Sequence, residues 1–246
     1  MVITIRVPEQ LAQYKQIVGK TYAEELGCTT TLNELGGISG VYRKPVVELI
    51  FGSSITETIH IENGIRFKVD PQKVMFSSGN MGERRRMATV AGTDETVVDL
   101  FAGIGYFTLP MAVYSKPKKI VACEINPVAF SYLQANIVLN DVSSIVEPVF
   151  GDNRMTAPKD CADRVVLGYL NEPQSYLQVA FECLRNHKGV LHYHVLIPTE
   201  SIPTQPLAHI ETVARQFDRS VELLKVNMVK SYAPRVDHVV LDVRSM

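Results

Sequence analysis

The chain has 246 residues, of which 46% are hydrophobic and 21% charged, and its formal net charge is −1. This composition is ordinary for a soluble globular protein of one large domain, or of one domain with a smaller appendage, and the near-neutral charge neither indicates nor excludes binding to nucleic acid. The opening MVITIRVPEQ lacks the features of a signal peptide, and no run of about 18 apolar residues exists, which predicts a cytoplasmic protein without membrane spans.

The first 80 residues predict short elements of mixed type. VITIRV is typical of a strand, and the apolar residues of 8–26 recur at helical spacing, with Gly27 near the end of that helix. Segments 41–52 and 56–70 alternate like strands, and Asn63-Gly64 is a strong signal for a two-residue hairpin. We expect a small N-terminal α+β domain over residues 1–75.

From about residue 92 onward, strands and helices alternate. Strands are expected over 96–102, 119–125, 145–151, 164–170 and 189–197, and helices through Met111 and over 127–140, 175–185 and 206–219. The alternation predicts a mostly parallel sheet with helices on both faces. The last two strands, 221–229 and 238–244, have no helix between them and predict a hairpin that adds one antiparallel strand. We expect residues 76–246 to form this α/β catalytic domain.

The four cysteines are widely spaced, and no two of them form a Cys-x-x-Cys pair: Cys28, Cys123, Cys161 and Cys183. Three of them lie inside apolar stretches. We therefore expect reduced side chains in the protein interior, with a disulfide or a metal set as the alternative.

Glycines mark the point where the strand at 96–102 turns into its helix. Gly103 and Gly105 lie there, and glycines at such a turn let the backbone approach a ligand. The next strand ends in Glu124, where a carboxylate accepts hydrogen bonds from both hydroxyls of a ribose. Asn126 is placed to cap the following helix, with Pro127 in its first turn.

The third strand ends in Asp152 and Asn153, which are placed to read the amino group and a ring nitrogen of adenine. Suitable groups at three successive strand ends favour S-adenosylmethionine as the cofactor. A nicotinamide dinucleotide is the rival interpretation, but GIGYFT lacks the third glycine that it requires. For any single polar residue of the set, a role as a helix cap or turn residue is the alternative.

Four segments together resemble the enzymes that modify guanosine 37 of tRNA: ENGIRFKVDPQKVMFSSGNMGERRRM, DLFAGIGYFTLP, CEINPVAFSYLQANIVLN and DRVVLG with GVLHYHV. One branch of this family methylates N1 of the guanosine, and the other comprises the wybutosine-synthesis aminocarboxypropyltransferases. The resemblance covers about residues 40–246. It implies a Rossmann-like class I methyltransferase fold with a seven-stranded, mostly parallel sheet.

Two positions separate the branches. Where the methyltransferases have Phe-Ser-Pro-Arg, this chain has Ser78 and Gly79 in the last two places. Where their strand after Asp-Arg-Val ends in Asn-Leu-Pro, this chain has Gly168, and its own Asn171-Glu172-Pro173 comes three residues too late. The bare Gly168 leaves room for the methionine arm of the cofactor to lie differently. Both departures imply the aminocarboxypropyl branch, and the lack of an extra N-terminal domain fits its short archaeal type.

The resemblance also implies site residues. Ser77 is expected to contact the cofactor, and Arg84 to pair with its methionine carboxylate. Arg85 and Arg86 are expected on the tRNA backbone, with a solvated helix face as the alternative. The whole expected cofactor set is Ser77, Arg84, Phe101, Ala102, Gly103, Glu124, Ile125, Asn126, Asp152, Asn153 and Gly168. No catalytic base and no metal ligand is predicted.

His192 and His194 alternate along one strand and so share a face. A place in the core or on the sheet face is the first interpretation, with a catalytic role or a metal pair as alternatives. Because a modified base must leave its stack to reach a pocket, Tyr106 and Tyr169 are candidates for stacking on it, although Tyr106 has packing on its own helix as an alternative.

Several basic residues are candidates for a patch that follows the phosphates of tRNA, and ordinary surface positions are the alternative for them. They are Arg43, Lys44, Arg66, Lys68, Lys73, Lys116, Lys118 and Lys119.

The resemblance finally implies an activity: transfer of the 3-amino-3-carboxypropyl group from S-adenosylmethionine to 4-demethylwyosine at position 37, in the anticodon loop of tRNA(Phe). A monomer without metal or membrane is expected to carry it out. The alternatives are N1-methylation of guanosine 37, a silent tRNA-binding module, and methylation of a small molecule or a protein.

Overall fold

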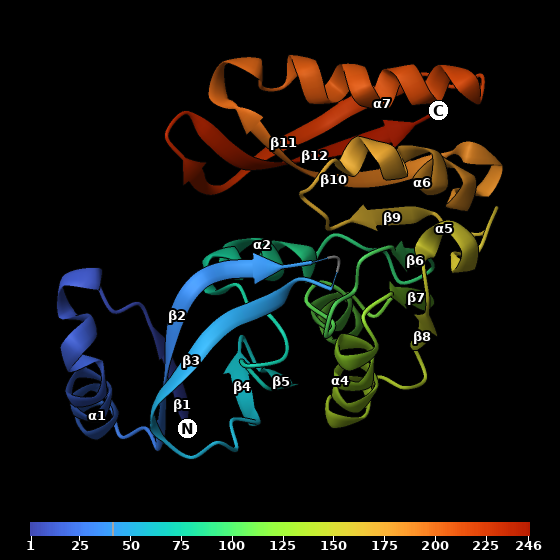
Figure 1. Cartoon of the computed structure of the whole chain (residues 1–246). Coiled ribbons are helices and arrows are strands. Elements are labelled where there is room, and N and C mark those ends of the chain that lie inside the picture. The colour runs from blue at the N-terminus through green and yellow to red at the C-terminus, as the bar shows by residue number, and fades with distance from the viewer. Residues whose placement is uncertain (41) are drawn as a thin grey trace. The chain divides into compact units, whose positions relative to one another are not determined.

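The computed structural model describes residues 1–40 and 42–246 and divides the chain into two compact units (Figure 1). The smaller unit comprises Met1–Glu62 and Arg66–Ser77, and the larger comprises Asn63–Ile65 and Ser78–Met246. Among the described residues, no helix combines the length and the apolar composition needed to cross a bilayer.

The smaller unit contains a three-stranded sheet. Its strands β1 (Val2–Ile5), β2 (Thr30–Ser39) and β3 (Lys44–Gly52) lie in this order, with β1 parallel to β2 and β2 antiparallel to β3. The sequence predicted β3 over 41–52, of which Val41 lies outside the described residues. It did not predict β2, because TTLNELGGIS has no clear alternation and carries two adjacent glycines.

A helix covers this sheet, as the spacing of 8–26 predicted. It begins as a 3₁₀ segment, η1 (Glu9–Tyr14), and continues as α1 (Lys15–Glu25), which packs on β2 and β3. The apolar residues that revealed the helix face solvent, however: Leu11, Tyr14 and Ile17 are exposed. Gly19 and Ala23 form the buried face instead, and these small residues let the helix lie close to the strands.

The predicted hairpin is confirmed. Strands β4 (Thr58–Glu62) and β5 (Ile65–Val69) form a two-stranded sheet, and the two residues between them, Asn63 and Gly64, have φ values of 49° and 78°. Two successive residues with positive φ make the turn whose twist suits a tight hairpin.

A seven-stranded sheet forms the centre of the larger unit, and it confirms the expected fold class. Its order is β11-β12-β10-β9-β6-β7-β8. The five strands from β10 to β8 run parallel, and β12 is antiparallel to both of its neighbours, as the closing hairpin predicted. The bounds are β6 (Thr96–Asp99), β7 (Lys119–Glu124), β8 (Val146–Phe150), β9 (Arg164–Leu167), β10 (Gly189–Pro198), β11 (Val221–Ala233) and β12 (Val236–Ser245).

Helices lie on both faces of this sheet (Figure 1). α4 packs against β7 and β8, whereas α6 contacts α7, which packs against β11 and β12. The helices are α2 (Met81–Met87), α3 (Thr108–Pro110) with its continuation η3 (Met111–Ser115), α4 (Pro127–Leu139), α5 (Asn153–Thr156), α6 (Leu177–Cys183) and α7 (Thr204–Gln216). Short 3₁₀ segments are η2 (Ser78–Asn80), η4 (Pro173–Tyr176), η5 (Arg185–His187) and η6 (Thr199–Ser201). Asn171-Glu172-Pro173 therefore leads into η4, which is the turn expected from its register.

Alternation along the strands separates two kinds of interior. On β10, Leu191, Tyr193 and Val195 belong to the apolar core that also contains residues of α6 and α7. His192 and His194, between them in the sequence, are equally buried but point to the opposite face. All four cysteines are free, and Cys123 and Cys183 are buried in this same core.

Candidate functional site

The glycine turn after β6 is closed by the carboxylate that ends β7. Gly103 has a φ of 59°, and a Cβ on it would lie 2.3 Å from Cε2 of Tyr106, so only glycine fits there. The Gly103 N–H donates to Oε2 of Glu124 over 2.8 Å, and the Asn126 N–H donates to Oε1 over 2.6 Å. These two bonds fix the orientation of the Glu124 carboxylate at the end of its strand.

Asn126 and Pro127 begin α4 as the sequence predicted. Oδ1 of Asn126 accepts hydrogen bonds from the N–H groups of Val128 and Ala129 over 2.9 and 3.4 Å, and Pro127 occupies the first turn. This is a helix cap, which satisfies backbone donors that would otherwise lack partners. The amide oxygen of Asn126 is thus committed to the helix.

The two polar residues after β8 differ in their surroundings. Asp152 caps α5 by accepting from the Arg154 N–H, and its carboxylate also bonds Nε of Arg154 over 2.9 and 3.0 Å. The hydrogen bonds and charge of Arg154 lower the pKa of Asp152. Asn153 is only 6% exposed, and its Nδ2 donates to the Leu100 carbonyl over 2.7 Å.

Asn153 carries an unsatisfied acceptor. Its Oδ1 is buried and has no hydrogen-bond partner within residues 1–40 and 42–246. Buried amide oxygens are rarely left in this state, because the loss of water is then uncompensated. The orphaned oxygen fits a ligand that donates a hydrogen bond, as the amino group of an adenine does. Gly103, Glu124, Asp152 and Asn153 are called the strand-end site below.

Asp99, the last residue of β6, is a buried carboxyl that the sequence analysis missed. Thr108 donates its hydroxyl to Oδ2 over 2.7 Å, and the Phe101 N–H donates to Oδ1 over 3.2 Å. Burial raises the pKa of Asp99 to about 6, although these two bonds oppose the shift. Its hydrogen bonds tie the turn to the start of α3, so we assign Asp99 to the support of the glycine turn.

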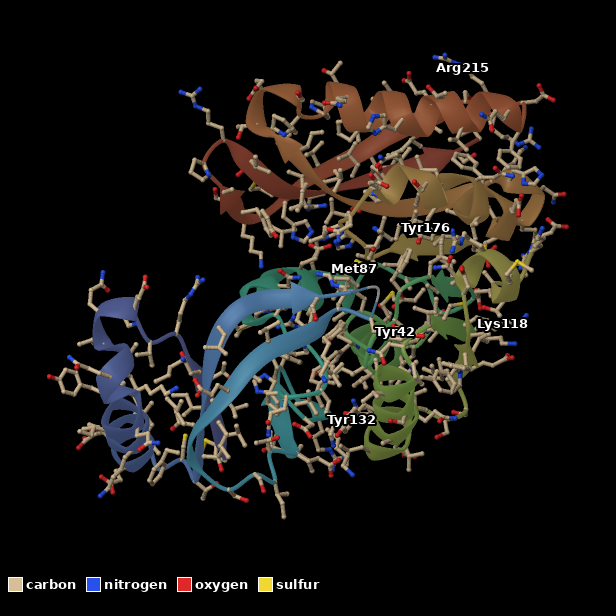
Figure 2. All side chains as sticks on the ribbon, in the orientation of Figure 1. Tyr42, Met87, Lys118, Tyr132, Tyr176 and Arg215 are labelled. Atoms are coloured by element: carbon tan, nitrogen blue, oxygen red, sulfur yellow. The ribbon has the colours of Figure 1, made fainter. Side chains whose placement is uncertain are left out.

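An aromatic cluster lies next to the turn. The rings of Phe101 and Tyr169 are stacked with centroids 4.9 Å apart, and Tyr176 meets Phe101 edge to face at 4.8 Å. The guanidinium of Arg154 lies 5.7 Å from the centroid of the Tyr176 ring, and Figure 2 labels Tyr176 on its segment η4. The cluster brings the ends of β6 and β9 together with η4. The sequence had indicated Phe101 as a cofactor residue and Tyr169 as a stacking candidate, but not Tyr176.

Gly168 lies against Phe107. A Cβ on Gly168 would be 3.1 Å from Cε2 of Phe107 and 3.9 Å from the Phe101 carbonyl oxygen. The first of these distances is tighter than an ordinary contact, so any side chain at 168 requires Phe107 to shift. The room that the sequence predicted at this glycine is therefore a narrow space bordered by a phenylalanine ring.

The other expected cofactor residues have varied settings. Ala102 is fully buried, and its N–H bonds the Cys123 carbonyl over 2.9 Å. Phe101 and Ile125 are half-buried at the ends of β6 and β7. Ser77 ends the smaller unit and is half-buried there.

The three successive arginines of α2 have three different environments. Arg84 is 2% exposed and is the largest of the fully buried side chains, whereas Arg85 is exposed. Arg86 bonds both Glu83 and Asp242, with its Nε 2.8 Å from Glu83 Oε2 and its NH1 2.6 Å from Asp242 Oδ2. Arg86 is thus half-buried and paired with two carboxylates, and its expected contact with tRNA phosphates stays a prediction.

The histidines lie in a buried polar network on one sheet face. Glu95 binds Arg164, whose NH1 lies 2.7 Å from Nε2 of His192, and Nδ1 of His192 lies 2.6 Å from Oδ1 of Asp242. Because arginine only donates, Nε2 of His192 accepts and Nδ1–H donates, which is the neutral ring. Burial lowers the pKa of His192 in agreement with this state. We call Glu83, Arg86, Glu95, Arg164, His192 and Asp242 the sheet-face network.

His194 and His238 continue this face of the sheet. Nδ1 of His194 lies 3.2 Å from Nε2 of His238, and the His194 ring packs on Phe107 with centroids 4.8 Å apart. Burial lowers the pKa of both rings, to about 4 for His238. The first interpretation from the sequence, a place on the sheet face, is thus confirmed. Within residues 1–40 and 42–246, no group of three or more His, Cys, Asp or Glu side chains could hold a metal ion.

Some of the basic residues proposed for a phosphate patch have carboxylate partners. Lys68 pairs with Glu57, Lys73 with Asp70, and Lys119 with Glu147. Lys116 and Lys118 are exposed on the connection before β7, and Figure 2 labels Lys118 there.

Two family models match successive parts of the chain, and the boundary between them lies within the smaller unit. A family model described as the TRM5/TYW2 methyltransferase domain matches residues 58–224. The chain belongs to the TRM5/TYW2 family. A second model, the TYW2 N-terminal domain, matches residues 1–56. The resemblance found from sequence motifs is thereby confirmed, and the match extends to the smaller unit.

Similar proteins include members of the aminocarboxypropyl branch. The tRNA(Phe) (4-demethylwyosine(37)-C(7)) aminocarboxypropyltransferase of Pyrococcus horikoshii is 40% identical over 243 residues, which is 99% of this chain and 86% of the relative. The crystal structure of P. horikoshii TYW2 in complex with MeSAdo matches with a TM-score of 0.89 at 38% identity, covering 100% of this chain and 88% of that one. M. jannaschii TYW2 in complex with AdoMet matches with a TM-score of 0.80 at 40% identity, covering 89% and 94%.

Proposed function

We propose that this protein transfers the 3-amino-3-carboxypropyl group from S-adenosylmethionine to 4-demethylwyosine at position 37 of tRNA(Phe). The observation that carries the proposal is the match of nearly the whole chain to an aminocarboxypropyltransferase, together with the match of residues 1–56 to the TYW2 N-terminal domain. Gly79 and Gly168 support the same branch, since neither position has the side chain of the methyltransferase motifs.

The strand-end site would hold the nucleoside part of the donor. Glu124, oriented by two backbone N–H groups, accepts from the ribose hydroxyls. The orphaned Oδ1 of Asn153 accepts from the adenine amino group, which supplies its missing partner. Gly103 lets the backbone approach the ligand, and Phe101, Ala102, Ile125, Asn126, Asp152 and Gly168 border it. Ser77 and Arg84 are assigned to the methionine end by resemblance.

The reaction needs little acid–base help from the protein. The sulfonium is a good leaving group, so the bond from sulfur to the aminocarboxypropyl carbon breaks as a carbon–carbon bond forms at the acceptor ring. The acceptor carbon loses a proton, and 5′-methylthioadenosine leaves. What the chain's own residues supply is alignment, because reacting atoms held about 3–3.5 Å apart remove much of the barrier. The narrow space between Gly168 and Phe107 restricts the pose of the arm.

The acceptor base would reach this site from the anticodon loop. A base that leaves its stack gains a new stacking partner from an aromatic side chain. Tyr169 and Tyr176, half-buried beside the glycine turn, offer such a surface. We also propose that the smaller unit contributes to tRNA binding, and that the enzyme acts as a monomer in the cytoplasm, where its four free cysteines remain reduced.

Two labelled donors test the proposal. S-adenosylmethionine labelled at the methyl carbon, or at the carboxyl carbon, is incubated with the protein and with tRNA(Phe) that contains 4-demethylwyosine. We expect the carboxyl label in the tRNA and the methyl label in the small-molecule fraction. Methyl label in the tRNA would refute the proposal and favour N1-methylation, and the same assay on tRNA with an unmodified guanosine 37 would show which base accepts it.

A further inference from the structure

Lys230 of β11 lies in the space that Gly79 leaves open. A Cβ built on Gly79 would be 3.0 Å from Nζ of Lys230 and 3.2 Å from its Cδ. Gly79 does not have a positive φ, so its backbone conformation does not require glycine. What the absent side chain provides is therefore space, and the lysine side chain occupies that space where η2 packs against β11.

Lys230 is also within electrostatic reach of Arg84. Arg84 is 2% exposed, and Lys230 is half-buried. Burial and the charge of Arg84 lower the pKa of Lys230. An anion beside the two cations would offset this repulsion, because an opposite charge favours the protonated amine.

Packing contacts connect this pair to the strand-end region. Lys230 is the register partner of His238, whose ring bonds His194. The His194 ring packs on Phe107, and Phe107 borders Gly168 at the end of β9. The ammonium thus lies on the same sheet face as the residues that border the proposed donor site.

We propose that Lys230 is a second anchor for the carboxylate of S-adenosylmethionine, acting together with Arg84, and that glycine at position 79 makes room for its ammonium group. The inference rests on the proposed function, since it concerns the methionine end of that donor. A carboxylate held by a guanidinium and an ammonium has fewer poses than one held by a single cation. Lys230 therefore restricts the arm that is transferred, as a binding and positioning residue.

The test compares two nucleosides that differ in this arm. 5′-Methylthioadenosine has the adenosine and the sulfur but no carboxylate. Calorimetric titration of both nucleosides should show that Lys230→Met weakens binding of S-adenosylmethionine about tenfold, as expected for the loss of one charge-assisted hydrogen bond, and changes binding of methylthioadenosine less than about twofold. Lys230→Arg, which keeps the charge, should restore most of the affinity.

Two further variants separate this role from a structural one. Lys225→Met removes an exposed lysine from the same strand and should leave both affinities unchanged. Gly79→Ala places a Cβ against the ammonium and should weaken binding of S-adenosylmethionine about threefold. Combined with Lys230→Met, it should cause little additional loss of affinity. Equal weakening of both nucleosides, or unchanged affinity for S-adenosylmethionine in Lys230→Met, would overturn the inference.

These titrations need neither tRNA nor turnover. A selective loss of affinity for S-adenosylmethionine in Lys230→Met would support the anchoring role of Lys230 even if the labelled donors showed methyl transfer. In that case only the proposed function would fail. Conversely, transfer of the carboxyl label with unchanged donor affinity in Lys230→Met would leave the proposed function intact and remove Lys230 from the site.

Discussion

The strand-end site and the sheet-face network contain similar polar groups but present them in opposite ways. In the strand-end site, Glu124 is the last residue of β7 and Asn153 follows β8, and Oδ1 of Asn153 lacks a partner among the described residues. In the sheet-face network, Arg86 and His192 both bond Asp242 within the protein. The groups of the strand-end site are thus offered to a ligand, whereas those of the sheet-face network hold the sheet and its helices together.

The difference has a physical origin. At a strand end the chain leaves the sheet, so backbone donors and side chains there need partners that the sheet does not supply. On the face of a buried strand, a charged group must be paired at once, because an unpaired charge in the interior is costly. Burial would raise the pKa of Asp242, but the hydrogen bond from His192, together with the charge and hydrogen bond of Arg86, lowers it to about 2.

The largest effect should come from breaking the sheet-face network. Asp242→Asn keeps the shape of the side chain but removes the charge that Arg86 and His192 bind, so we expect a loss of about 3 kcal/mol in the free energy of unfolding. Urea denaturation followed by circular dichroism measures this loss. Affinity for S-adenosylmethionine under folding conditions should change less than about twofold. A large loss of affinity with intact stability would show that the sheet-face network binds the donor and does not stabilise the fold.

A control and a pH series sharpen this prediction. Glu222→Gln breaks the exposed pair between Glu222 of β11 and Arg244 of β12 and should lower the free energy of unfolding by less than about 0.5 kcal/mol. The folded-state pKa of Asp242, about 2, lies below the ordinary value of 3.8. Its contribution is therefore complete above about pH 4 and is lost as the pH falls toward 2. The difference in free energy of unfolding between wild type and Asp242→Asn should become smaller as the pH falls from 5 to 3. A constant difference would contradict an ionised Asp242 in the folded protein.

The next largest effect should be on binding at the strand-end site. Glu124→Ala removes a carboxylate with two expected ribose hydroxyls as donors, so the Kd for S-adenosylmethionine should rise about 100-fold. Isothermal calorimetry measures it, with Glu147→Ala on neighbouring β8 as the control, because Glu147 is exposed and pairs with Lys119. If Glu124→Ala binds the donor as well as Glu147→Ala does, Glu124 is only a support for the glycine turn.

A smaller effect is expected at the orphaned acceptor. Asn153→Ala should raise the Kd for both S-adenosylmethionine and methylthioadenosine about tenfold, because both carry the adenine that Oδ1 is proposed to bind. Asn140→Ala is the matched control, since the Asn140 side chain also donates to a backbone carbonyl, over 2.8 Å. Weaker binding of one nucleoside alone would contradict an adenine contact.

The smallest effect concerns Gly168. Gly168→Ala should lower the free energy of unfolding by about 1 kcal/mol, because the new methyl group presses on the Phe107 ring. Adding Phe107→Leu should recover part of that loss, and thermal denaturation of the single and double variants measures the coupling. An unchanged melting temperature in Gly168→Ala would show that the space beside Phe107 is wider than the contact distance indicates.

What the sequence could predict depended on how local the interaction was. Gly103, the cap at Asn126 and the hairpin at Asn63-Gly64 were found because each depends on a few adjacent residues. Arg86 with Asp242, and Phe107 with His194, were not found, because each pair joins segments far apart in the chain. Helix α1 shows a third case. The helix itself was predicted correctly, but the face that it buries was not. Gly19 and Ala23 pack on the sheet while the larger apolar residues face solvent, since close approach to the sheet requires small side chains.

Identification of the nucleoside coproduct tests the central claim most directly. The protein is incubated with unlabelled S-adenosylmethionine and tRNA(Phe) that contains 4-demethylwyosine. The small molecules are then separated by chromatography and identified and quantified by mass spectrometry. Transfer of the aminocarboxypropyl group predicts 5′-methylthioadenosine in an amount equal to the modified tRNA, with a tRNA-free incubation as the blank. S-adenosylhomocysteine in its place would mean methyl transfer and would contradict the account.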